Sequence, residues 1–143
     1  MIYTEVTKRA MCFAYQAHHG QYDKSGLPYI FHPLHLAEQM TTEETTLAAL
    51  LHDVMEDTDY TLDDIRALGV PESVCEALLL LTHDKSVPYL DYVRNLRENP
   101  IARAVKLADL QHNNDLTRLD VVDEKALNRV EKYKKAIQIL ETV

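Results

Sequence analysis

The run LAALLHDVMEDT, residues 47–58, restricts the fold more than any other part of the chain. Its apolar residues recur at helical spacing and predict a buried helix over about residues 43–56. His52 and Asp53 stand side by side in this apolar surrounding, where polar side chains destabilise a core unless they have partners. The rest of the chain must therefore supply partners for a polar pair near the end of a buried helix.

The other signals along the chain are almost all helical. Capping residues, apolar periodicity and prolines that suit a first helical position mark the expected boundaries. We see no alternation typical of a strand, no internal repeat and no linker. The sequence therefore predicts an all-α fold, a compact bundle of seven to nine helices that forms one domain over residues 1–143. The predicted helices cover about residues 4–19, 33–40, 43–56, 61–69, 71–83, 88–99, 100–114 and 123–140.

The charge argues against two classes of partner. The chain has 15 Lys and Arg against 23 Asp and Glu, a formal net charge of −8. Nucleic-acid binding and anionic-membrane binding both need clustered basic residues, so we expect neither. No apolar run approaches the roughly 20 residues that span a bilayer. The N-terminal MIYTEVTKRAM lacks a signal-peptide pattern, and we expect a cytoplasmic protein.

Cysteine usage agrees with that expectation. Cys12 and Cys75 lie far apart in the sequence, each at an apolar position of a predicted helix. We expect two buried free thiols rather than a disulfide.

Polar side chains gather on one flank of the central predicted helix. His52 and Glu56 are four residues apart, Asp53 and Glu56 are three apart, and Asp57 follows Asp53 by four. A solvated helix end explains Glu56 and Asp57. It explains His52 less well, because apolar residues surround it.

Two further segments offer similar groups. His32 directly precedes a proline at a predicted helix entry. Asp109 lies on one helical stripe with Lys106 and Asn113, at i, i+3 and i+7. A buried Asp109 needs a partner, and a metal or a histidine would serve. His112, three residues later, fits either a structural histidine or a group that supports a ligand.

These groups form a candidate metal site. A set of two histidines and two aspartates suits Mn²⁺, Fe²⁺ or Zn²⁺ better than Cu(I), and Mg²⁺ less well, because Mg²⁺ prefers oxygen ligands alone. Such a metal acidifies bound water and polarises a phosphoryl group, and it also makes a phosphorylated substrate compatible with an acidic chain. Glu56 and Asp57 would orient that water or accept its proton. The candidate ligands are His32, His52, Asp53 and Asp109.

Four segments, in this order and spacing, match a known family: AHHGQ (17–21), SGLPYIFHPLHLA (25–37), AALLHDVMEDT (48–58) and VKLADLQHN (105–113). Over about residues 5–120 the chain resembles the HD-domain metal-dependent phosphohydrolases. It is most similar to the hydrolase domain of the RelA/SpoT alarmone enzymes, including their small stand-alone versions. The resemblance implies a helical bundle, a Mn²⁺ ion, and hydrolysis of the 3′-diphosphate of guanosine tetra- or pentaphosphate with release of pyrophosphate.

The resemblance also implies residue roles, position by position. A small phosphorylated nucleotide is the implied substrate, and nothing in the sequence predicts an oligomeric state. The implied metal ligands are His32, His52, Asp53 and Asp109, the implied water-activating residues are Glu56 and Asp57, and Asn113 is implied to contact the substrate or to assist catalysis.

The loop before SGLPYI departs from the family. The family usually has adjacent basic residues there, the first of which packs against the guanine base. This chain has Tyr22-Asp23-Lys24, and Asp23 cannot make the cation–π contact of an arginine. Lys24 and Tyr22 remain as candidate substrate-binding residues, with Tyr22 able to stack on a base.

Two other hypotheses follow. Asp23 favours a nucleotidase or phosphatase of the same fold that acts on a different nucleotide. A non-catalytic nucleotide-binding protein is the other hypothesis, and the presence of Glu56, Asp57 and Asn113 argues against it.

Three remaining segments keep plain interpretations. Tyr89 and Tyr92 either stack on a substrate or pack their helix onto the bundle. Thr82-His83-Asp84 is taken as a helix end. The last helix is expected to have a solvated outer face of alternating charges, while its bundle-facing side is expected to carry Leu127, Val130, Tyr133, Ile137 and Leu140.

Overall fold

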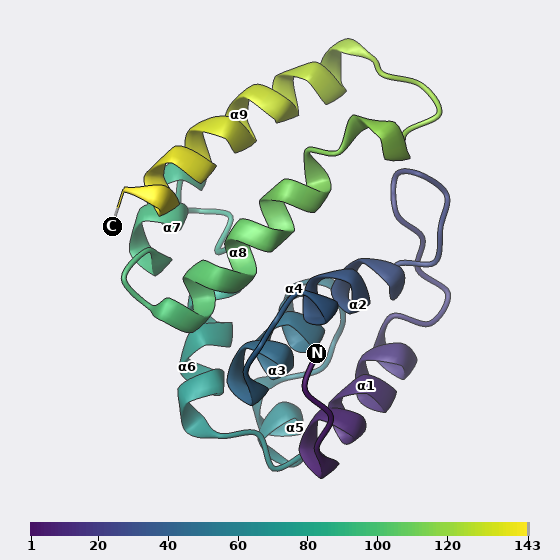
Figure 1. Ribbon diagram of the computed structural model, residues 1–143, viewed down its shortest axis with the longest axis vertical. Coiled ribbons are helices and arrows are strands. Elements are labelled where there is room, and N and C mark those ends of the chain that lie inside the picture. Colours follow the sequence, from purple (N-terminus) through teal and green to yellow (C-terminus); the bar gives the residue numbers. More distant parts are fainter. Residues whose placement is uncertain (143) are drawn as a thin grey trace.

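The computed structural model describes residues 1–142, and within them the fold is all-α (Figure 1). The prediction of an all-α bundle with seven to nine helices is confirmed. Between α1 and α2 the backbone forms an isolated β-bridge that joins Tyr22 and Pro28. The elements are α1 (Glu5–Ala17), α2 (Phe31–Glu38), α3 (Glu43–Leu51), α4 (Val54–Asp57), α5 (Leu62–Arg66), α6 (Glu72–Leu81), α7 (Tyr89–Leu96), α8 (Pro100–Asn113), the 3₁₀ turn η1 (Leu116–Arg118) and α9 (Glu124–Glu141).

Helix α3 is the centre of the bundle. Each residue from Thr46 to Leu51 is completely buried, so the helix is covered on all sides. Helices α1, α2, α6 and α8 pack around it. Helix α9 packs against α7 and α8, and in Figure 1 it runs along the outer side of α8. The central position of α3 explains why its terminal polar residues can meet groups from several other helices.

Local signals account for most helix boundaries. The Thr4 and Thr61 side chains each accept a hydrogen bond from the third residue of the following helix, in reciprocal capping boxes. The Asp123 side chain caps α9 through the backbone N–H of Ala126, as predicted. Pro100 occupies the first position of α8, where it forfeits no hydrogen bond.

Two predicted boundaries are wrong. The helix expected over residues 43–56 is two helices, interrupted at His52 and Asp53. Helix α2 begins at Phe31, so Pro33 is its third residue rather than its first. The first-turn N–H groups of a helix have no intrahelical acceptor, and the proline is therefore tolerated at this position as well.

Two predicted burials are also wrong. Cys12 is exposed, whereas Cys75 is buried, and both are free thiols. The buried residues of α1 include Ala10 and Ala14, and Cys12 lies on the opposite side of that helix. Leu127 is 52% exposed, because α9 turns Ala126 toward the bundle instead.

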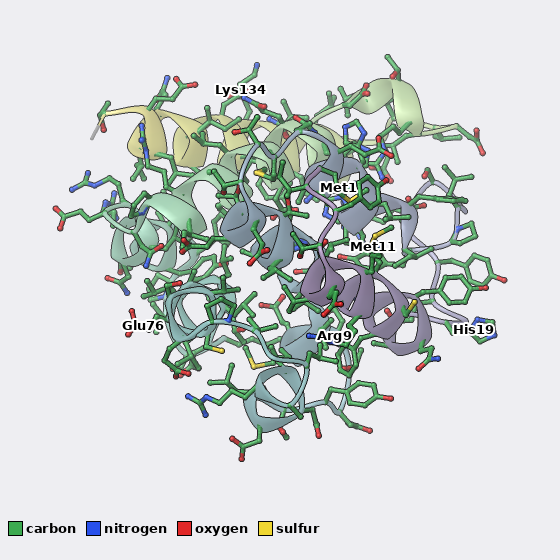
Figure 2. All side chains as sticks on the ribbon, turned by 60° about the horizontal axis from the view of Figure 1, so that its bottom comes forward. Met1, Arg9, Met11, His19, Glu76 and Lys134 are labelled. Carbon is green, nitrogen blue, oxygen red and sulfur yellow. The ribbon has the colours of Figure 1, made fainter. Side chains whose placement is uncertain are left out.

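Figure 2 shows that charged and polar side chains cover the outside of the bundle, with His19, Glu76 and Lys134 pointing away from the helices. Among residues 1–142, none of the helices combines the length and the apolar character needed to cross a membrane.

The central position of α3 leads to a stability prediction. Leu47→Ala removes a completely buried side chain from α3 and should lower the free energy of unfolding by about 2–5 kcal/mol. Leu79→Ala is the matched control, because Leu79 is 55% exposed on α6 and its truncation should change stability by less than about 0.5 kcal/mol. Urea unfolding of both variants measures the difference, and equal losses would contradict the assignment of α3 as the core helix.

Candidate metal centre and active site

The interruption between α3 and α4 brings His52 and Asp53 together. Neighbouring residues of a continuous helix point in different directions. Here Asp53 leaves the helical conformation, with φ −106° and ψ 1°. This backbone is in the sparsely populated bridge region, where active-site residues are often found. As a result, Asp53 Oδ2 lies 2.9 Å from His52 Nε2.

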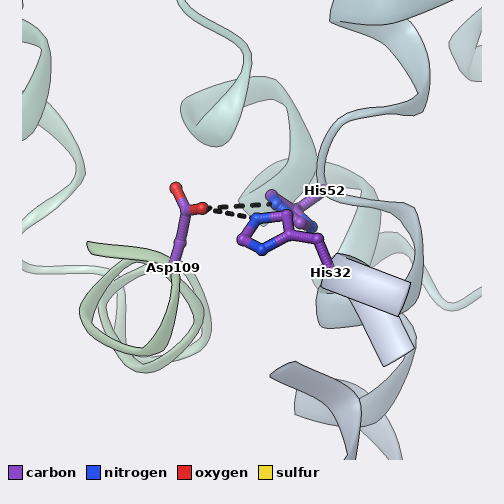
Figure 3. Close-up of side chains that lie close together, drawn as sticks. All are labelled: His32, His52 and Asp109. Atoms are coloured by element: carbon purple, nitrogen blue, oxygen red, sulfur yellow. Dashed lines mark hydrogen bonds and ion pairs between the residues drawn. The ribbon is translucent and has the colours of Figure 1, made fainter. Parts of the chain in front are cut away.

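Two other helices complete a buried cluster at the same point (Figure 3). His32 from α2 places its Nε2 atom 2.8 Å from Oδ1 of Asp109 on α8. His52 Nε2 lies 3.7 Å from the same oxygen. All three side chains are almost completely buried. One candidate ligand atom from each of the three lies within 4.8 Å of the others, a spacing compatible with a shared metal ion.

The protonation of His52 shows that this cluster fits a cation. His52 Nδ1 lies 2.7 Å from the Ala49 carbonyl oxygen, which can only accept, so Nδ1 carries the proton. Nε2 faces the carboxylates of Asp53 and Asp109, at 2.9 Å and 3.7 Å. Burial lowers the pKa of His52, but Asp53 and Asp109 outweigh burial and raise it well above the ordinary value. The two carboxylates therefore favour a positive charge at Nε2, which a proton supplies without a metal and which a divalent metal ion would supply in its place.

Asp109 is held ionised by its neighbours. Burial alone would raise its pKa, but the Lys106 ammonium and the two histidines hold the pKa well below the ordinary range. Lys106 Nζ lies 2.8 Å from Asp109 Oδ2, and Asn113 Nδ2 donates to Asp109 Oδ1 at 3.0 Å. The stripe of Lys106, Asp109 and Asn113 expected from the sequence therefore acts as one unit.

His112 contacts the His32 ring through the nitrogen that does not face Asp109. The Nδ1 atoms of the two rings are 2.7 Å apart, and the rings are stacked. Burial, together with the charges of Arg118 and His32, lowers the pKa of His112 to about 4. A neutral His112 can accept a hydrogen bond from His32 Nδ1, which orients the Nε2 atom of His32 toward Asp109. Of the two interpretations from the sequence, the geometry favours the group that supports a ligand.

Asp53 lies beside the cluster rather than among its three closest members. Its Oδ2 accepts a hydrogen bond from the Tyr29 hydroxyl. Burial and the Asp53 charge raise the pKa of Tyr29, so that the hydroxyl stays protonated and donates. The buried His18 packs against the Tyr29 ring, with 4.8 Å between ring centroids. Neither Tyr29 nor His18 was singled out from the sequence, although both lie in the segments that carry the family resemblance.

Glu56 and Asp57 lie where the sequence suggested, next to the cluster. Both line a polar cavity of about 200 Å³, as do Asp53 and Asp109. Glu56 Oε1 accepts from the backbone N–H of His83 at 2.8 Å. Burial and the charges of Asp53 and Glu56 raise the pKa of Asp57 to about 6. A carboxylate with this pKa can accept a proton near neutral pH.

A second cavity of about 300 Å³ adjoins the first, and Tyr29, Asn113 and Tyr133 line both. Tyr22 and Lys24, the candidate substrate-binding residues, line this second cavity. Its other lining residues are Asp23, Ser25, Asp115, Arg118, Leu119 and Arg129. The expectation of a wholly solvated outer face on α9 therefore does not hold for Arg129.

Tyr89 and Tyr92 have different environments. Tyr92 is buried and its hydroxyl donates to the Leu81 carbonyl oxygen at 2.5 Å, which supports the packing interpretation. Both tyrosines line the smaller cavity, as does His83. The Thr82–Asp84 helix end, to which no function was attached, thus contributes to the cavity wall. A turn that follows an apolar helix carries no sequence signal for this position.

Comparisons with known proteins agree with the resemblance drawn from the motifs. A guanosine-3′,5′-bis(diphosphate) 3′-pyrophosphohydrolase of Danio rerio, named MESH1, is 35% identical over an alignment 129 positions long, which covers 80% of this chain and 71% of that protein. This chain belongs to the same pyrophosphohydrolase family. A probable guanosine-3′,5′-bis(diphosphate) 3′-pyrophosphohydrolase from Synechocystis is 36% identical over an alignment 143 positions long, which covers 90% of this chain. No family model matches the chain.

A solved structure supports the family membership. It is described as a metazoan ortholog of SpoT that hydrolyses ppGpp, and it superposes with a TM-score of 0.78 at 26% sequence identity. The match covers 99% of this chain and 89% of that chain. Relatives within the pyrophosphohydrolase family differ in length. This chain matches only 19% of the length of the Synechocystis protein and 20% of the length of the Aquifex aeolicus protein.

The cluster predicts metal-dependent stability. At 100 times its dissociation constant, a divalent metal ion, with Mn²⁺ as the first probe, should stabilise the protein by about 2.7 kcal/mol. The rise in melting temperature should persist in Glu56→Ala and disappear in His52→Ala. His19→Ala is the matched control, because His19 points into solvent (Figure 2). Loss of the metal response in Glu56→Ala, as complete as in His52→Ala, would contradict the division between metal ligands and water-activating residues.

Asp57 predicts a pH-dependent change in stability. Its folded pKa, about 6, is above the ordinary Asp value of 3.8, so the ionised form is disfavoured in the folded protein. The stability that protonated Asp57 contributes is complete below the unfolded pKa and is lost as pH rises through 6. Because Asp57 is partly exposed, Asp57→Asn should stabilise the metal-free protein by about 1 kcal/mol at pH 7.5.

Thermal unfolding in chelator at pH 4 and pH 7.5 tests this prediction. Asp57→Asn should be more stable than the natural protein only at pH 7.5. A gain of equal size at both values would point to packing rather than charge.

Proposed function

We propose that this protein is a metal-dependent pyrophosphohydrolase that acts on guanosine 3′,5′-bis(diphosphate). Water would add to the phosphorus attached to the ribose 3′-oxygen and the bond between them would break. The products would be pyrophosphate and guanosine 5′-diphosphate, with a proton taken up by the 3′-oxygen. The observation that carries this proposal is the buried cluster of His32, His52 and Asp109 beside two carboxylates, in a chain that belongs to this family.

His32, His52, Asp53 and Asp109 are the residues that would hold the metal, which we propose to be Mn²⁺, with Fe²⁺ and Zn²⁺ as alternatives. The cluster combines imidazole and carboxylate donors without a thiolate, a set that suits these ions. When bound, such an ion supplies a polarised phosphoryl oxygen and a more acidic water.

Each carboxylate near the cluster would have its own task. Glu56, fixed by the His83 amide, would orient the attacking water. Asp57, with its raised pKa, would accept the proton. Lys106 balances the charge of Asp109 and keeps that carboxylate ionised. Asn113 donates a hydrogen bond to Asp109 and lines both cavities. This position supports a contact with the substrate.

The two cavities suggest how a nucleotide would lie. Its 3′-diphosphate would occupy the smaller cavity, near the metal ligands, and the nucleoside would occupy the larger one. Burial lowers the pKa of Lys24, and the nearby charges of Arg129 and Lys132 lower it further. A chain with a net charge of −8 thus gathers cations beside this cavity, where they can bind the 5′-diphosphate. Tyr22 remains our candidate for stacking.

Asp23 favours a second candidate function. The family's basic residue is absent from this position, so a hydrolase with the same chemistry could act on another nucleotide. The cytoplasmic location of this protein, expected from the sequence, stays a prediction.

Turnover tests both candidates. The Mn²⁺-loaded protein should release pyrophosphate from guanosine tetraphosphate, and Glu56→Ala should retain the metal but lose at least about 100-fold in kcat. Lys134→Ala, on the outer side of α9 (Figure 2), should keep the natural rate. Absence of pyrophosphate release across a range of pH would refute the first candidate. If NADPH and deoxynucleoside monophosphates are also left intact, the second fails too.

A further inference from the structure

Asp23 is a structural residue of its loop. Its Oδ1 atom accepts hydrogen bonds from Ser25 N at 2.9 Å, from Ser25 Oγ at 2.6 Å and from Leu27 N at 3.0 Å. These bonds close the turn, and Gly26 occupies the left-handed conformation that the turn requires. They account for one carboxylate oxygen. The other oxygen is available to a partner from elsewhere in the chain.

That partner is Arg118, 95 residues away in the sequence. Arg118 Nη2 donates to Asp23 Oδ2 at 3.0 Å, and Arg118 Nη1 donates to the His112 carbonyl oxygen at 2.8 Å. The Arg118 and Asp23 side chains are only 20% and 9% exposed. Figure 1 shows the connection between α8 and α9, where Arg118 lies, on the same side of the molecule as the loop after α1. The guanidinium is therefore fixed in orientation by two elements.

Arg118 lines the larger cavity but not the smaller one. One N–H of each Nη group already has an acceptor, and the Asp23 carboxylate is paired with the guanidinium charge. An arginine in this state offers a phosphate fewer free donors and less net charge than an unpaired arginine. Because Arg118 lines the larger cavity, a ligand there can meet its guanidinium, and a guanidinium that is fixed in orientation is suited to stack on a nucleobase.

We propose that Arg118 recognises the nucleobase of the substrate by stacking on it. The guanidinium that the family carries in the loop at position 23 would then come from the connection between α8 and α9, with Asp23 holding it in place. This inference rests on the proposed nucleotide hydrolysis, and it identifies the residue that would contact the base of the substrate. Lys24 and Arg129 remain for phosphate.

Equilibrium binding separates the base end of the site from the phosphate end. Guanosine 5′-diphosphate and inorganic pyrophosphate are the two probes, measured by calorimetry on the Mn²⁺-loaded protein. Arg118→Ala should weaken binding of the nucleotide about tenfold or more and leave binding of pyrophosphate within about twofold. Arg118→Lys should be as weak as Arg118→Ala, because an ammonium has no planar face. Arg94→Ala, which removes an exposed arginine paired with Asp91 on α7, is the matched control.

Asp23→Asn separates base recognition by Arg118 from the role of Asp23 in holding Arg118. The amide keeps an acceptor oxygen for the turn and leaves Arg118 in the cavity, so nucleotide binding should weaken by less than about threefold. Four results would overturn the proposal: natural affinity in Arg118→Ala, natural affinity in Arg118→Lys, equal losses in Arg118→Ala and Asp23→Asn, or joint loss of both probes in Arg118→Ala. A natural protein that binds pyrophosphate but not the nucleotide would also overturn it. Arg118-dependent nucleotide binding without turnover of guanosine tetraphosphate would instead refute only the proposed function.

Discussion

The buried carboxylate of Asp109 is the constraint on which the active end of the bundle depends. An ionised carboxylate inside a protein is tolerated only with charged or hydrogen-bonding partners around it. Asp109 has four: His32, His52, Lys106 and Asn113. Because these come from α2, from the residue that follows α3, and from α8, the compensation of one charge fixes how three helices meet. The apolar surface of α3 drives their association, and Asp109 selects the arrangement.

Much of this arrangement could be predicted from the sequence. Caps at Thr61 and Asp123 mark helix starts through short-range hydrogen bonds, so local residue types suffice to place them. His32, His52 and Asp109 stand out because polar residues in apolar helices need an explanation, and family resemblance supplied one. What local patterns do not encode is the backbone break at Asp53, since helix periodicity continues through it.

Contacts between distant loops were also beyond prediction. Arg118 and Asp23 are each ordinary polar residues of a loop, and only the folded chain brings them to 3.0 Å. Tyr29 is similar: its position three residues before His32 is visible in the sequence, but its bond to Asp53 depends on how α2 meets the break after α3. Sequence patterns thus located the cluster of His32, His52 and Asp109 more fully than the larger cavity, whose walls depend on contacts between distant loops.

The bond between Glu56 and the His83 main chain has an evolutionary consequence. A side-chain partner could be lost in a single substitution, whereas every residue except proline provides a backbone N–H. This contact therefore depends on the backbone at position 83 and on the shape of the turn between α6 and α7, and not on the His83 side chain. Selection on this one contact would act on the length and conformation of the turn, whereas any constraint on the His83 side chain would come from its separate contacts with Val87 and Tyr92.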